Sequence, residues 1–545
     1  MIFLKGVVYY CGIGFSLCER FLNFMSFIYS DQQIAVRDAV LSGISCKVEA
    51  YAGTGKTATA VFSAASHKGT GFYFAFNRSA SEDAVPRFAV DAPHVRVSTI
   101  HAYAMRAIGY KYKDRLQQEP WKLRKAIKDR FSSRLHKVAL TTASEDLMIY
   151  AILDVLRNFS QSGATSIGLI HIPDIYLHIG SESKLIEEVL AVAREVWKDI
   201  SSVNGTFPVS HDDYLKIFQL KGYKIKADII YLDEGQDANG VALSILDAQK
   251  NTQKVILGDE NQSIYSWRGS VNAMKYFDFP TFPLTTSWRF GPQIAEIANL
   301  VLKAKQSRWP LLGAGPEGKV LLSSDRPPTA ILCRSNAGIV HSAIEQLDLG
   351  RKISVAGGTD RLISMIDGVY NLWSGKRSDH PSLRLFATWE DLENSAKSRQ
   401  GGSYRPFVKL INHYQFSIPE IVARLKSSIV SFEESDLVIA TVHSFKGQET
   451  PVVQTGSDFP EFAHQGPTAE RPDQIWGLAE EEANLAYVLL TRAQEEEQIG
   501  SYYKHFCSSL EIMADLLKSK SEPNDSDVKQ PIKKDSLKNP TLAVK

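Results

Sequence analysis

Short apolar runs that end in polar residues recur along the chain and predict its architecture. Residues 44–49 form one such run, which leads through a glycine-rich loop into residues 58–62, the order of a strand, a loop and a helix. Residues 71–80 and 95–103 read as two further strands, although each alone is also typical of a plain core strand. Because open α/β sheets place their sites beyond the carboxyl ends of strands, the polar endings are candidate site positions.

The pattern of buried strands continues in the second part of the chain. Residues 227–232 end in two carboxylates, and residues 254–262 end in Asp-Glu-Asn-Gln. Residues 328–334 and 436–441 read as strands of a second sheet. Residues 103–225 have a helical and polar pattern, so they interrupt the first group of strands.

A helix start is predicted directly before the first strand. Ser30 can act as its N-cap, with Gln33 in the third helical position of a capping box. The Gln33 amide therefore has two interpretations. It is either a capping residue, or the group that pairs with N6 and N7 of adenine.

Length and composition place the chain among globular proteins. At 545 residues it is too long for one core, and about three or four domains are expected. The hydrophobic content of 44% and the charged content of 23% are ordinary for soluble proteins. The net charge of +1 means that any nucleic-acid surface must be local. The 5 cysteines are scattered, and Cys46 and Cys333 read as buried thiols, which favours a reducing compartment over a disulfide framework.

The two ends of the chain differ from the rest. The apolar run at residues 6–18 is shorter than the roughly 20 residues that span a bilayer. It could mimic a signal peptide, but no clear small-residue cleavage site follows, so we interpret residues 1–24 as a leader of doubtful function, with Met25 opening the folded domain. Residues 518–545 are rich in Lys, Ser, Asp and Pro and predict a disordered tail.

The loop at residues 50–57 carries the clearest candidate chemistry. Its backbone N–H groups can surround a phosphate, and the following helix N-terminus adds a positive dipole. Lys56 would reach the β- and γ-phosphates, and the Thr57 hydroxyl would bind Mg²⁺. Ala50 stands where the first glycine of this motif is usual, so the loop taken alone could also be a chance match.

Two carboxylates after a buried strand are costly unless a cation or a reaction uses them. Asp233 suits Mg²⁺, together with Thr57 and water, and Glu234 suits polarisation of the attacking water. Gln262, after the next strand, could sense the γ-phosphate. The alternative for the two acids is an acidic surface turn.

Two features could contact nucleic acid. Trp267 beside Arg268 is either core packing or a base-stacking platform, and such stacking is worth roughly 1–3 kcal/mol per base. The start of residues 103–225 is either a solvated helix face or a surface that tracks phosphates. Its basic residues are Arg106, Lys111, Lys113, Arg115, Lys122, Arg124, Lys125, Lys128, Arg130 and Arg134.

The order of motifs resembles the UvrD/Rep-like branch of superfamily 1 DNA helicases, and within it the F-box DNA helicase type and its phage and bacterial relatives. The resemblance covers roughly residues 29–497. Its phrases, in family order, are AYAGTGKT, AFNRSA, STIHAYA, LDEGQD, GDENQSIYSWRGS, TTSWRF, ILCRSNA, ATVHSFKGQE and EEANLAYVLLTRAQ. Departures from the family are mild: Ala50, Gly235 where alanine is usual, and arginine in AFNRSA.

The resemblance implies an α/β fold of two RecA-like parallel-sheet lobes, each with an inserted, mainly helical subdomain. The implied divisions are a leader at 1–24, a first ATP-binding lobe at 25–102 and 226–289, a helical insertion at 103–225, a second lobe at 290–350 and 436–515, a small insertion at 351–435 and a disordered tail at 516–545. The small insertion is short beside that of the best-known family members.

The resemblance also implies a nucleotide site for ATP and Mg²⁺. In this reading Arg289 and Arg492 are arginine fingers, with surface arginines in salt bridges as the alternative for both. Gln262 couples hydrolysis to motion, Trp288 stacks on adenine and Glu449 lies on the ribose side. The implied catalytic set is Lys56, Glu234, Gln262, Arg289 and Arg492. The implied nucleotide-binding set is Gln33, Ala52, Gly53, Thr54, Gly55, Lys56, Thr57, Trp288 and Glu449, with Thr57 and Asp233 on the metal. Because no cluster of His or Cys resembles a metal site, Mg²⁺ is the only metal expected.

A strand-tracking groove follows from the same resemblance. Its implied residues are Phe76, Asn77, Arg78, Thr99, His101, Tyr265, Trp267, Arg334, Asn336, Thr441, His443 and Lys446. His101 could equally be a packing histidine. The expected partners are single-stranded DNA and junctions of single- and double-stranded DNA, with recombinase filaments or a single-strand-binding protein as further possibilities. A monomer is expected, located in the cytoplasm with the nucleoid, or in the nucleus of a eukaryote.

Three functions compete at this stage. The first is an ATP-dependent helicase that moves 3′→5′ on single-stranded DNA, a polarity taken only from the resemblance, in DNA repair, recombination or replication. The second is a translocase that displaces recombinase or other proteins without productive unwinding, which the small insertion motivates. The third is a binding module whose ATPase has decayed, which the complete set of chemical residues disfavours.

Overall fold

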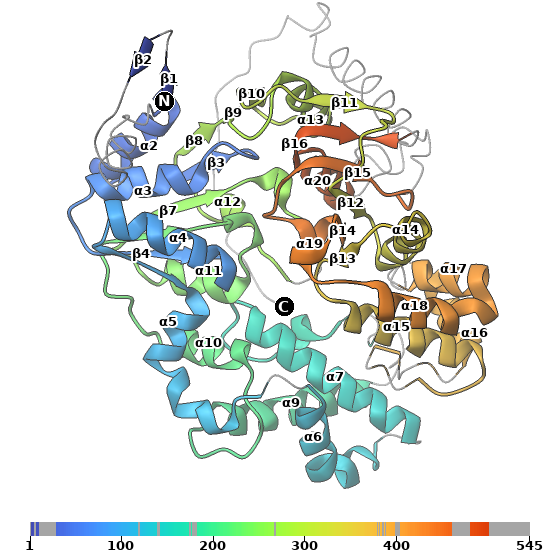
Figure 1. The fold of residues 1–545 in the computed structure, drawn as a ribbon. Coiled ribbons are helices and arrows are strands. Elements are labelled where there is room, and N and C mark those ends of the chain that lie inside the picture. The colour runs from blue at the N-terminus through green and yellow to red at the C-terminus, as the bar shows by residue number, and fades with distance from the viewer. Residues whose placement is uncertain are drawn as a thin grey trace, which may run out of the picture.

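The computed structural model describes residues 2–4, 7–9, 29–117, 120–138, 142–173, 176, 183–265, 269–378, 380, 382–383, 386, 388–397, 404–459 and 480–500. Two six-stranded parallel sheets dominate this part of the chain and lie in the two halves of the molecule (Figure 1). The predicted α/β fold class with two parallel-sheet lobes is confirmed.

The first sheet has the strand order β5-β4-β6-β7-β3-β8. Its strands are β3 (Cys46–Ala50), β4 (Gly71–Ala75), β5 (Val95–Thr99), β6 (Ile229–Leu232), β7 (Gln253–Gly258) and β8 (Thr281–Leu284). The helices around it are α2 (Asp31–Leu41), α3 (Lys56–Ser66), α4 (Arg78–Asp91), α5 (Ile100–Ala107), α11 (Gly240–Asp247) and α12 (Ala273–Tyr276), with short 3₁₀ turns η3 (Gly235–Asp237) and η4 (Glu260–Gln262). The crossover between β5 and β6 contains the helical insertion.

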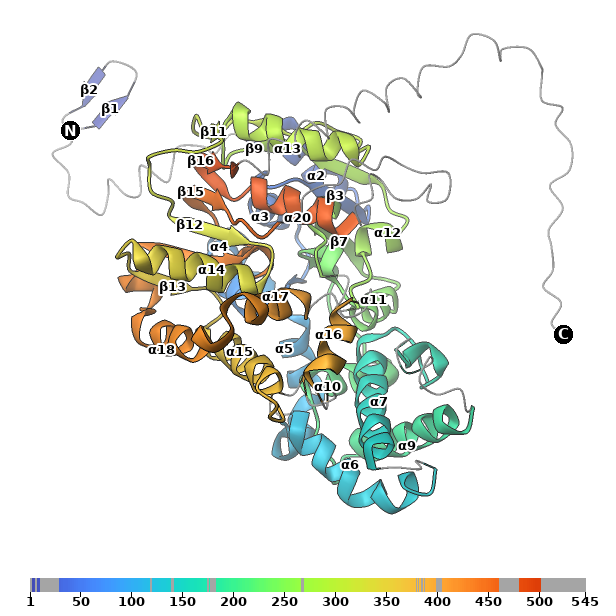
Figure 2. The ribbon, with the colours of Figure 1, turned by 90° about the vertical axis from the view of Figure 1, so that its right-hand side faces the viewer.

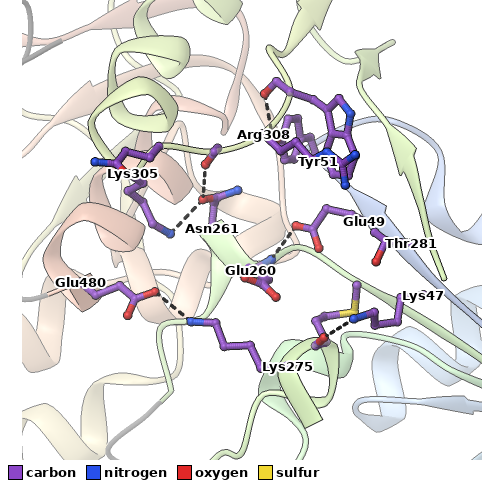
Figure 3. Close-up of a pocket in the computed structure, with 14 residues that line it drawn as sticks. Lys47, Glu49, Tyr51, Glu260, Asn261, Lys275, Thr281, Lys305, Arg308 and Glu480 are labelled. Carbon is purple, nitrogen blue, oxygen red and sulfur yellow. Dashed lines mark hydrogen bonds and ion pairs between the residues drawn. The ribbon is translucent and has the colours of Figure 1, made fainter. Parts of the chain in front are cut away.

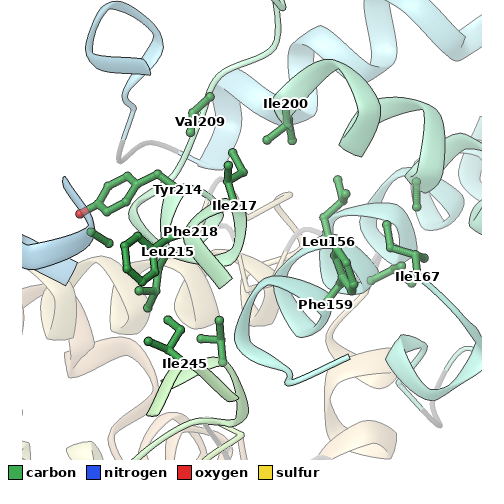
Figure 4. Packing of buried hydrophobic residues seen from close by; sticks show 14 of the residues in the cluster. Leu156, Phe159, Ile167, Ile200, Val209, Tyr214, Leu215, Ile217, Phe218 and Ile245 are labelled. Carbon is green, nitrogen blue, oxygen red and sulfur yellow. The ribbon is translucent and has the colours of Figure 1, made fainter. Parts of the chain in front are cut away.

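That insertion packs on the face of the sheet opposite α2 and α3. It contains η1 (Gly109–Arg115), α6 (Pro120–Leu135), α7 (Thr142–Gln161), η2 (Leu169–His171), α9 (Ser183–Ser201) and α10 (His211–Leu220). Its core is continuous with Phe72, Phe74 and Ile230 of the sheet. Figure 4 shows Phe159, Leu215 and Phe218 within this core, so the insertion is anchored to the first lobe.

The second sheet has the order β11-β16-β15-β12-β14-β13. Its strands are β11 (Lys319–Leu321), β12 (Ala330–Cys333), β13 (Ile353–Val355), β14 (Leu437–Thr441), β15 (Thr450–Thr455) and β16 (Ala493–Gln498). Helices α13 (Pro292–Ala304), α14 (Asn336–Asp348), α19 (Val442–Phe445) and α20 (Glu480–Leu490) accompany it. The short strands β9 (Thr286–Ser287) and β10 (Leu312–Gly313) pair with each other, and β1 (Ile2–Leu4) pairs with β2 (Val7–Tyr9).

One predicted boundary is corrected by the second sheet. Residues 351–435 were expected to be an insertion, but β13 lies within this range and pairs in parallel with β14. The insertion therefore starts after Val355. It contains α15 (Thr359–Trp373), α16 (Trp389–Lys397), α17 (Arg405–Tyr414), η6 (Gln415–Ser417), α18 (Ile418–Ser428) and η7 (Phe432–Glu434), of which α17 and α18 contact α14 (Figure 2).

A single buried cluster joins the two lobes. It contains Tyr51 and Ala52 from the phosphate loop together with α13, α19 and α20 of the second half. The Ala52 backbone N–H donates to the Tyr487 hydroxyl oxygen in this cluster, with nitrogen and oxygen 3.3 Å apart. The carboxyl ends of the first sheet therefore face the second lobe.

Candidate functional site

The phosphate loop follows β3 and ends at the first turn of α3. Gly53 and Gly55 have φ values of 73° and 84°, which L side chains rarely adopt. A Cβ on Gly53 would lie 2.5 Å from the Ser287 hydroxyl, so the loop is closely approached from β9. Gly55 is the N-cap of α3 and supplies no side-chain cap, which leaves the helix N-terminus available to an anion.

Lys56 and the two carboxylates after β6 meet at this loop. The Lys56 ammonium lies 3.0 Å from a Glu234 carboxylate oxygen. Burial alone would raise the pKa of Glu234, but Lys56 and then Lys446 outweigh it and lower that pKa to about 2. Burial and the Glu234 charge raise the pKa of Asp233 to about 6. The site thus keeps one carboxylate firmly ionised beside a second that is readily protonated.

Tyr73 on β4 ties Asp233 to Thr57. Its hydroxyl hydrogen-bonds both side chains, and burial raises its pKa well above the usual value. Asp233 and Thr57 therefore contact the same buried hydroxyl, and their side-chain oxygens would fit a Mg²⁺ ion that is held by few protein groups and by phosphates. Within the described residues, no group of three or more His, Cys, Asp or Glu side chains could hold a metal by itself.

Gln33 makes the contacts of a capping residue. The Ser30 hydroxyl accepts from the Gln33 N–H at 3.3 Å, and the Gln33 side-chain oxygen accepts from the Ser30 N–H at 3.0 Å. The Gln33 amide nitrogen also donates to the Thr59 hydroxyl at 3.1 Å. The predicted capping box is confirmed. Because Gln33 also lies against Gly55 of the loop, an additional contact to adenine stays a prediction.

Gln262 of the first lobe contacts both Asp259 of its own lobe and Arg492 of the second lobe. Its amide nitrogen donates to Asp259 at 2.7 Å, and Arg492 donates to its side-chain oxygen at 3.4 Å. Arg492 is 1% exposed and also donates to the backbone oxygens of Val488 and Gln448, at 2.9 and 3.3 Å. Burial lowers its pKa, but a guanidinium keeps its proton at neutral pH. A fixed cation from the second lobe therefore contacts the glutamine of the first.

Arg289 makes a second connection to the second lobe. It forms an ion pair with Glu449 and donates to the Thr491 backbone oxygen at 2.8 Å. Gln494 also donates to Glu449, at 3.0 Å. Trp288, next to Arg289, is 54% exposed, and its backbone N–H donates to the Gly53 oxygen at 2.9 Å. Trp288 and Arg289 therefore lie against Gly53 of the loop, and Arg289 connects them to Glu449 and Thr491 of the second lobe.

The other members of the predicted loop set, Ala52 and Thr54, are both buried. The Thr54 hydroxyl donates to the Tyr51 backbone oxygen at 2.8 Å, which fixes the turn rather than leaving the hydroxyl for a ligand. The backbone is the part of these residues that a phosphate could use.

Four of the predicted DNA-contacting residues form one cluster. The rings of Phe76 and Tyr265 stack with centroids 6.0 Å apart, and the Tyr265 hydroxyl donates to the His443 backbone oxygen at 2.8 Å. The Lys446 ammonium lies 5.2 Å from the centre of the Tyr265 ring. Phe76 is 41% exposed, so this cluster offers an aromatic surface at the boundary of the two lobes.

Lys446 is buried and paired, unlike a lysine that meets a phosphate from solvent. Its ammonium forms an ion pair with Asp237 and donates to the Gln262 backbone oxygen at 2.5 Å. It also lowers the pKa of Glu234. Lys446 thus connects the aromatic cluster to Asp237 and Glu234, the carboxylates that follow β6.

Several other predicted DNA residues have structural roles in helix starts. Asn77, Thr99 and Thr441 are the N-caps of α4, α5 and α19, and their side-chain oxygens accept from backbone N–H groups at 2.8, 3.1 and 3.2 Å. Asn336 is the first residue of α14, behind the Ser335 cap. These positions follow strand ends, so capping explains them without a ligand.

The remaining predicted residues are engaged in ion pairs. His101 lies 3.1 Å from Asp212, and Arg78 lies 2.7 Å from Glu82 while being largely exposed. Arg334 forms a forked ion pair with Glu482 of α20. Trp267 lies outside the described residues, so its stacking role stays a prediction.

At the basic start of the helical insertion, Arg115, Arg124, Lys128, Arg130 and Arg134 form ion pairs with neighbouring acids. Arg124 and Lys128 contact Asp146 at 2.8 and 3.3 Å, and Arg130 contacts Asp199 at 3.1 Å. Arg134 lies 2.5 Å from both Glu188 and Glu195. This pairing favours the solvated helix face over a phosphate-tracking surface.

Sequence reasoning missed several residues that build the site. Tyr73, Gln236, Asp237 and Asp259 are buried and contact the predicted residues. Gln236 donates to Glu234 at 2.5 Å and accepts from the Asp259 N–H at 3.0 Å. Gln236, Asp237 and Asp259 follow the ends of β6 and β7, which could have marked them, whereas Tyr73 lies in the middle of β4. In the described part of the chain, no helix is long and apolar enough to cross a membrane.

Comparisons with known proteins find similar sequences among DNA helicases. The family model for the UvrD/REP helicase N-terminal domain matches residues 216–278, which include β6 and β7. F-box DNA helicase protein 1 of Schizosaccharomyces pombe is 29% identical over 86% of this chain and 56% of its own length. F-box DNA helicase 1 of Gallus gallus is 28% identical over 90% of this chain and 51% of its own.

Two further matches are shorter or more distant. The ATP-dependent DNA helicase PcrA of Leuconostoc citreum is 32% identical over 17% of this chain and 13% of its own length. The crystal structure of an arterivirus nonstructural protein 10 (helicase) covers 89% of this chain and 65% of that chain, with 11% identity and a TM-score of 0.32, which is too low to establish a shared fold. The chain thus spans about half the length of the F-box relatives that it matches.

Proposed function

We propose that this chain, a relative of the UvrD/Rep-like DNA helicases, hydrolyses ATP to move along single-stranded DNA and to unwind duplexes. The observation that carries the proposal is the convergence of groups from both lobes on one phosphate loop. Lys56 and Glu234 come from the first lobe, and Arg492 reaches Gln262 from the second. Such a division makes catalysis depend on how the lobes meet.

Each residue of the site has its own role in the proposed binding and hydrolysis of ATP. Gly53, Gly55 and the α3 N-terminus cradle the phosphates, and Lys56 balances their charge. Mg²⁺ held near Thr57 and Asp233 would neutralise charge on the transferring group. Glu234 polarises the attacking water, while Arg289 and Arg492 stabilise the charge that develops. Gln33, Trp288 and Glu449 hold the nucleoside.

The direction 3′→5′, a role in repair, recombination or replication, a monomeric state and a cytoplasmic or nuclear location belong to this proposal and are taken from the resemblance. Single-stranded DNA and its junctions with duplex are the proposed substrates. The aromatic cluster of Phe76 and Tyr265 supports a strand contact, because exposed rings can stack on bases.

The decisive experiment measures ATP hydrolysis with and without single-stranded DNA. We expect strong stimulation by DNA in the wild-type protein and its loss in Glu234→Gln. Glu495→Gln is the matched control, because Glu495 is a half-exposed carboxylate paired with Arg326 away from the loop. If DNA does not stimulate hydrolysis by the wild-type protein, the proposed DNA-binding groove is wrong. If Glu234→Gln keeps full activity, the proposed catalytic role of Glu234 is wrong.

A second candidate function is the displacement of recombinase or other proteins from single-stranded DNA without productive unwinding. The observation that favours it is the small insertion, which consists of the short helices α15 to α18 in the described part. A forked-duplex assay and a filament-clearance assay on the same preparation separate the two functions. Robust unwinding would favour the helicase, and clearance without unwinding would favour the alternative.

A further inference from the structure

A cavity of about 370 Å³ lies on the face of β3 that carries Lys47 and Glu49 (Figure 3). The other face of β3, with Cys46, Val48 and Ala50, packs in the core under α2 and α3. Lys56, Asp233 and Glu234 are not among the residues that line this cavity. It is therefore a separate space from the proposed nucleotide site.

The charges on β3 are unusual for a strand inside a parallel sheet. Such strands are normally covered on both faces and read as continuous apolar runs. Here β3 lies between β7 and β8, yet its sequence is Cys-Lys-Val-Glu-Ala. Lys47 and Glu49 alternate with apolar residues. This pattern is expected where one face of the strand lines a polar cavity instead of packing against a helix.

Both lobes supply the walls of the cavity. Lys305, just after α13, donates to Asn261 at 2.8 Å and also to Asn484 of α20. Lys275 lies 3.4 Å from Glu480 at the start of α20, and the Tyr51 hydroxyl donates to the Trp309 backbone oxygen at 2.9 Å. A ligand in this space would contact elements from both halves of the molecule.

Positive charge predominates on the lining. The cations are Lys47, Lys275, Lys305 and Arg308, and the carboxylates are Glu49, Glu260 and Glu480. Glu480 is compensated by Lys275. Burial, with the nearby Asp259 and Glu260, raises the pKa of Glu49 to about 8, and burial lowers the pKa of Lys305, so both groups carry less charge than they would in water.

Hydrogen bonds and ring contacts hold the cationic groups in place. Lys47 donates to the Met274 backbone oxygen at 3.0 Å, which leaves two further N–H donors on its ammonium. The Arg308 guanidinium lies 4.9 Å from the centre of the Trp309 ring. Prepositioned ammonium and guanidinium donors suit the oxygens of a phosphate.

We propose that this interlobe cavity binds a small phosphate-bearing anion, with Lys47, Lys305 and Arg308 as its cationic partners. The volume is in the range of small-molecule sites and would admit a mononucleotide as well as inorganic phosphate. Both sources share the phosphate group that the lining recognises.

The test is calorimetric titration of the full chain in two steps. A non-hydrolysable ATP analogue with Mg²⁺ is added first to saturate the proposed nucleotide site, and this step reports separately on that site. AMP and inorganic phosphate are then titrated in parallel. We expect a second binding event that is at least tenfold weaker in Arg308→Glu and unchanged in Arg326→Glu, a matched reversal at an exposed arginine away from the cavity.

The outcomes separate the sources and can overturn the proposal. Binding of AMP alone supports a nucleoside monophosphate as the ligand, and binding of both probes supports recognition of the phosphate alone. The absence of a second binding event overturns the proposal. So does equal affinity in the wild type and Arg308→Glu, or an equal loss in both arginine variants.

Discussion

At the scale of single residues, Lys56 balances the most acidic carboxylate of the site. Its ammonium is 3.0 Å from Glu234, and it is the first cation that lowers the Glu234 pKa. Lys56→Ala removes this compensation and the proposed phosphate contact. We expect ATP hydrolysis to fall below detection while DNA binding is retained, as measured by turnover and by a strand-binding titration. Lys250→Ala, at an exposed lysine paired with Asp247, should keep full turnover.

Arg492 is the residue through which the second lobe acts on Gln262. Replacing it with Gln removes the cation but keeps donors for the backbone oxygens that it contacts. An arginine that stabilises phosphoryl transfer is worth on the order of 10³–10⁵ in rate, so we expect kcat to drop by at least about 10³. Steady-state ATPase kinetics check this. A variant with an unchanged kcat would assign Arg492 to structure alone.

At the scale of elements, β16 contains a buried acid outside the proposed site. Glu497 is fully buried, one of its oxygens has no hydrogen-bond partner, and burial raises its pKa well above the usual value. The native state keeps this proton while the unfolded chain loses it above about pH 4.5, so stability contributed by Glu497 falls as pH rises.

Glu497→Gln should remove that pH dependence, because the amide has no proton to lose. We expect the variant to be stabilised at pH 8 and nearly unchanged at pH 5. A gain of about 1 kcal/mol raises the melting temperature by roughly 2–4 °C in a domain of 150–250 residues. Thermal unfolding at the two pH values measures the difference. Equal shifts at both would mean that Glu497 is ionised in the native protein.

Elements also show how far the sequence could predict the structure. The strands around the phosphate loop and the capped helix after Ser30 were predictable, because apolar runs and capping residues act locally. The strand-like patterns at residues 71–80 and 95–103 ended too late, since Asn77 and Thr99 cap α4 and α5 and end the extended backbone. Asn and Thr side chains are typical of both a strand end and a helix cap, so the sequence pattern alone does not show where the strand stops.

Contacts between distant segments were less predictable. Lys446 was predicted to contact DNA, but its ammonium pairs with the buried Asp237, which lies 209 positions earlier in the sequence. β13 was assigned to an insertion because a three-residue strand has too short a pattern to detect. Residues such as Tyr73 and Gln236 look like ordinary core or turn residues until their partners are known.

At the scale of the whole molecule, the two lobes share a core and several polar contacts. Arg289, Lys305 and Lys446 each join one lobe to the other, through Thr491, Asn261 and Asp237 respectively. Lys446 is central because one ammonium contacts Asp237 and the Gln262 backbone and lies over the Tyr265 ring. A strand that stacks on the Phe76 and Tyr265 cluster would therefore act on the nucleotide site through Lys446.

Lys446→Met should uncouple the aromatic cluster of Phe76 and Tyr265 from the proposed nucleotide site. We expect basal ATP hydrolysis to persist and its stimulation by single-stranded DNA to fall at least tenfold, measured as turnover at increasing DNA concentration. Because the single variant leaves Asp237 buried without its cation, Lys446→Met combined with Asp237→Asn is the control for stability. The double variant should recover the melting temperature but remain uncoupled, since the link to Tyr265 is still missing. Recovery of DNA stimulation in the double variant would instead assign Lys446 to charge balance alone.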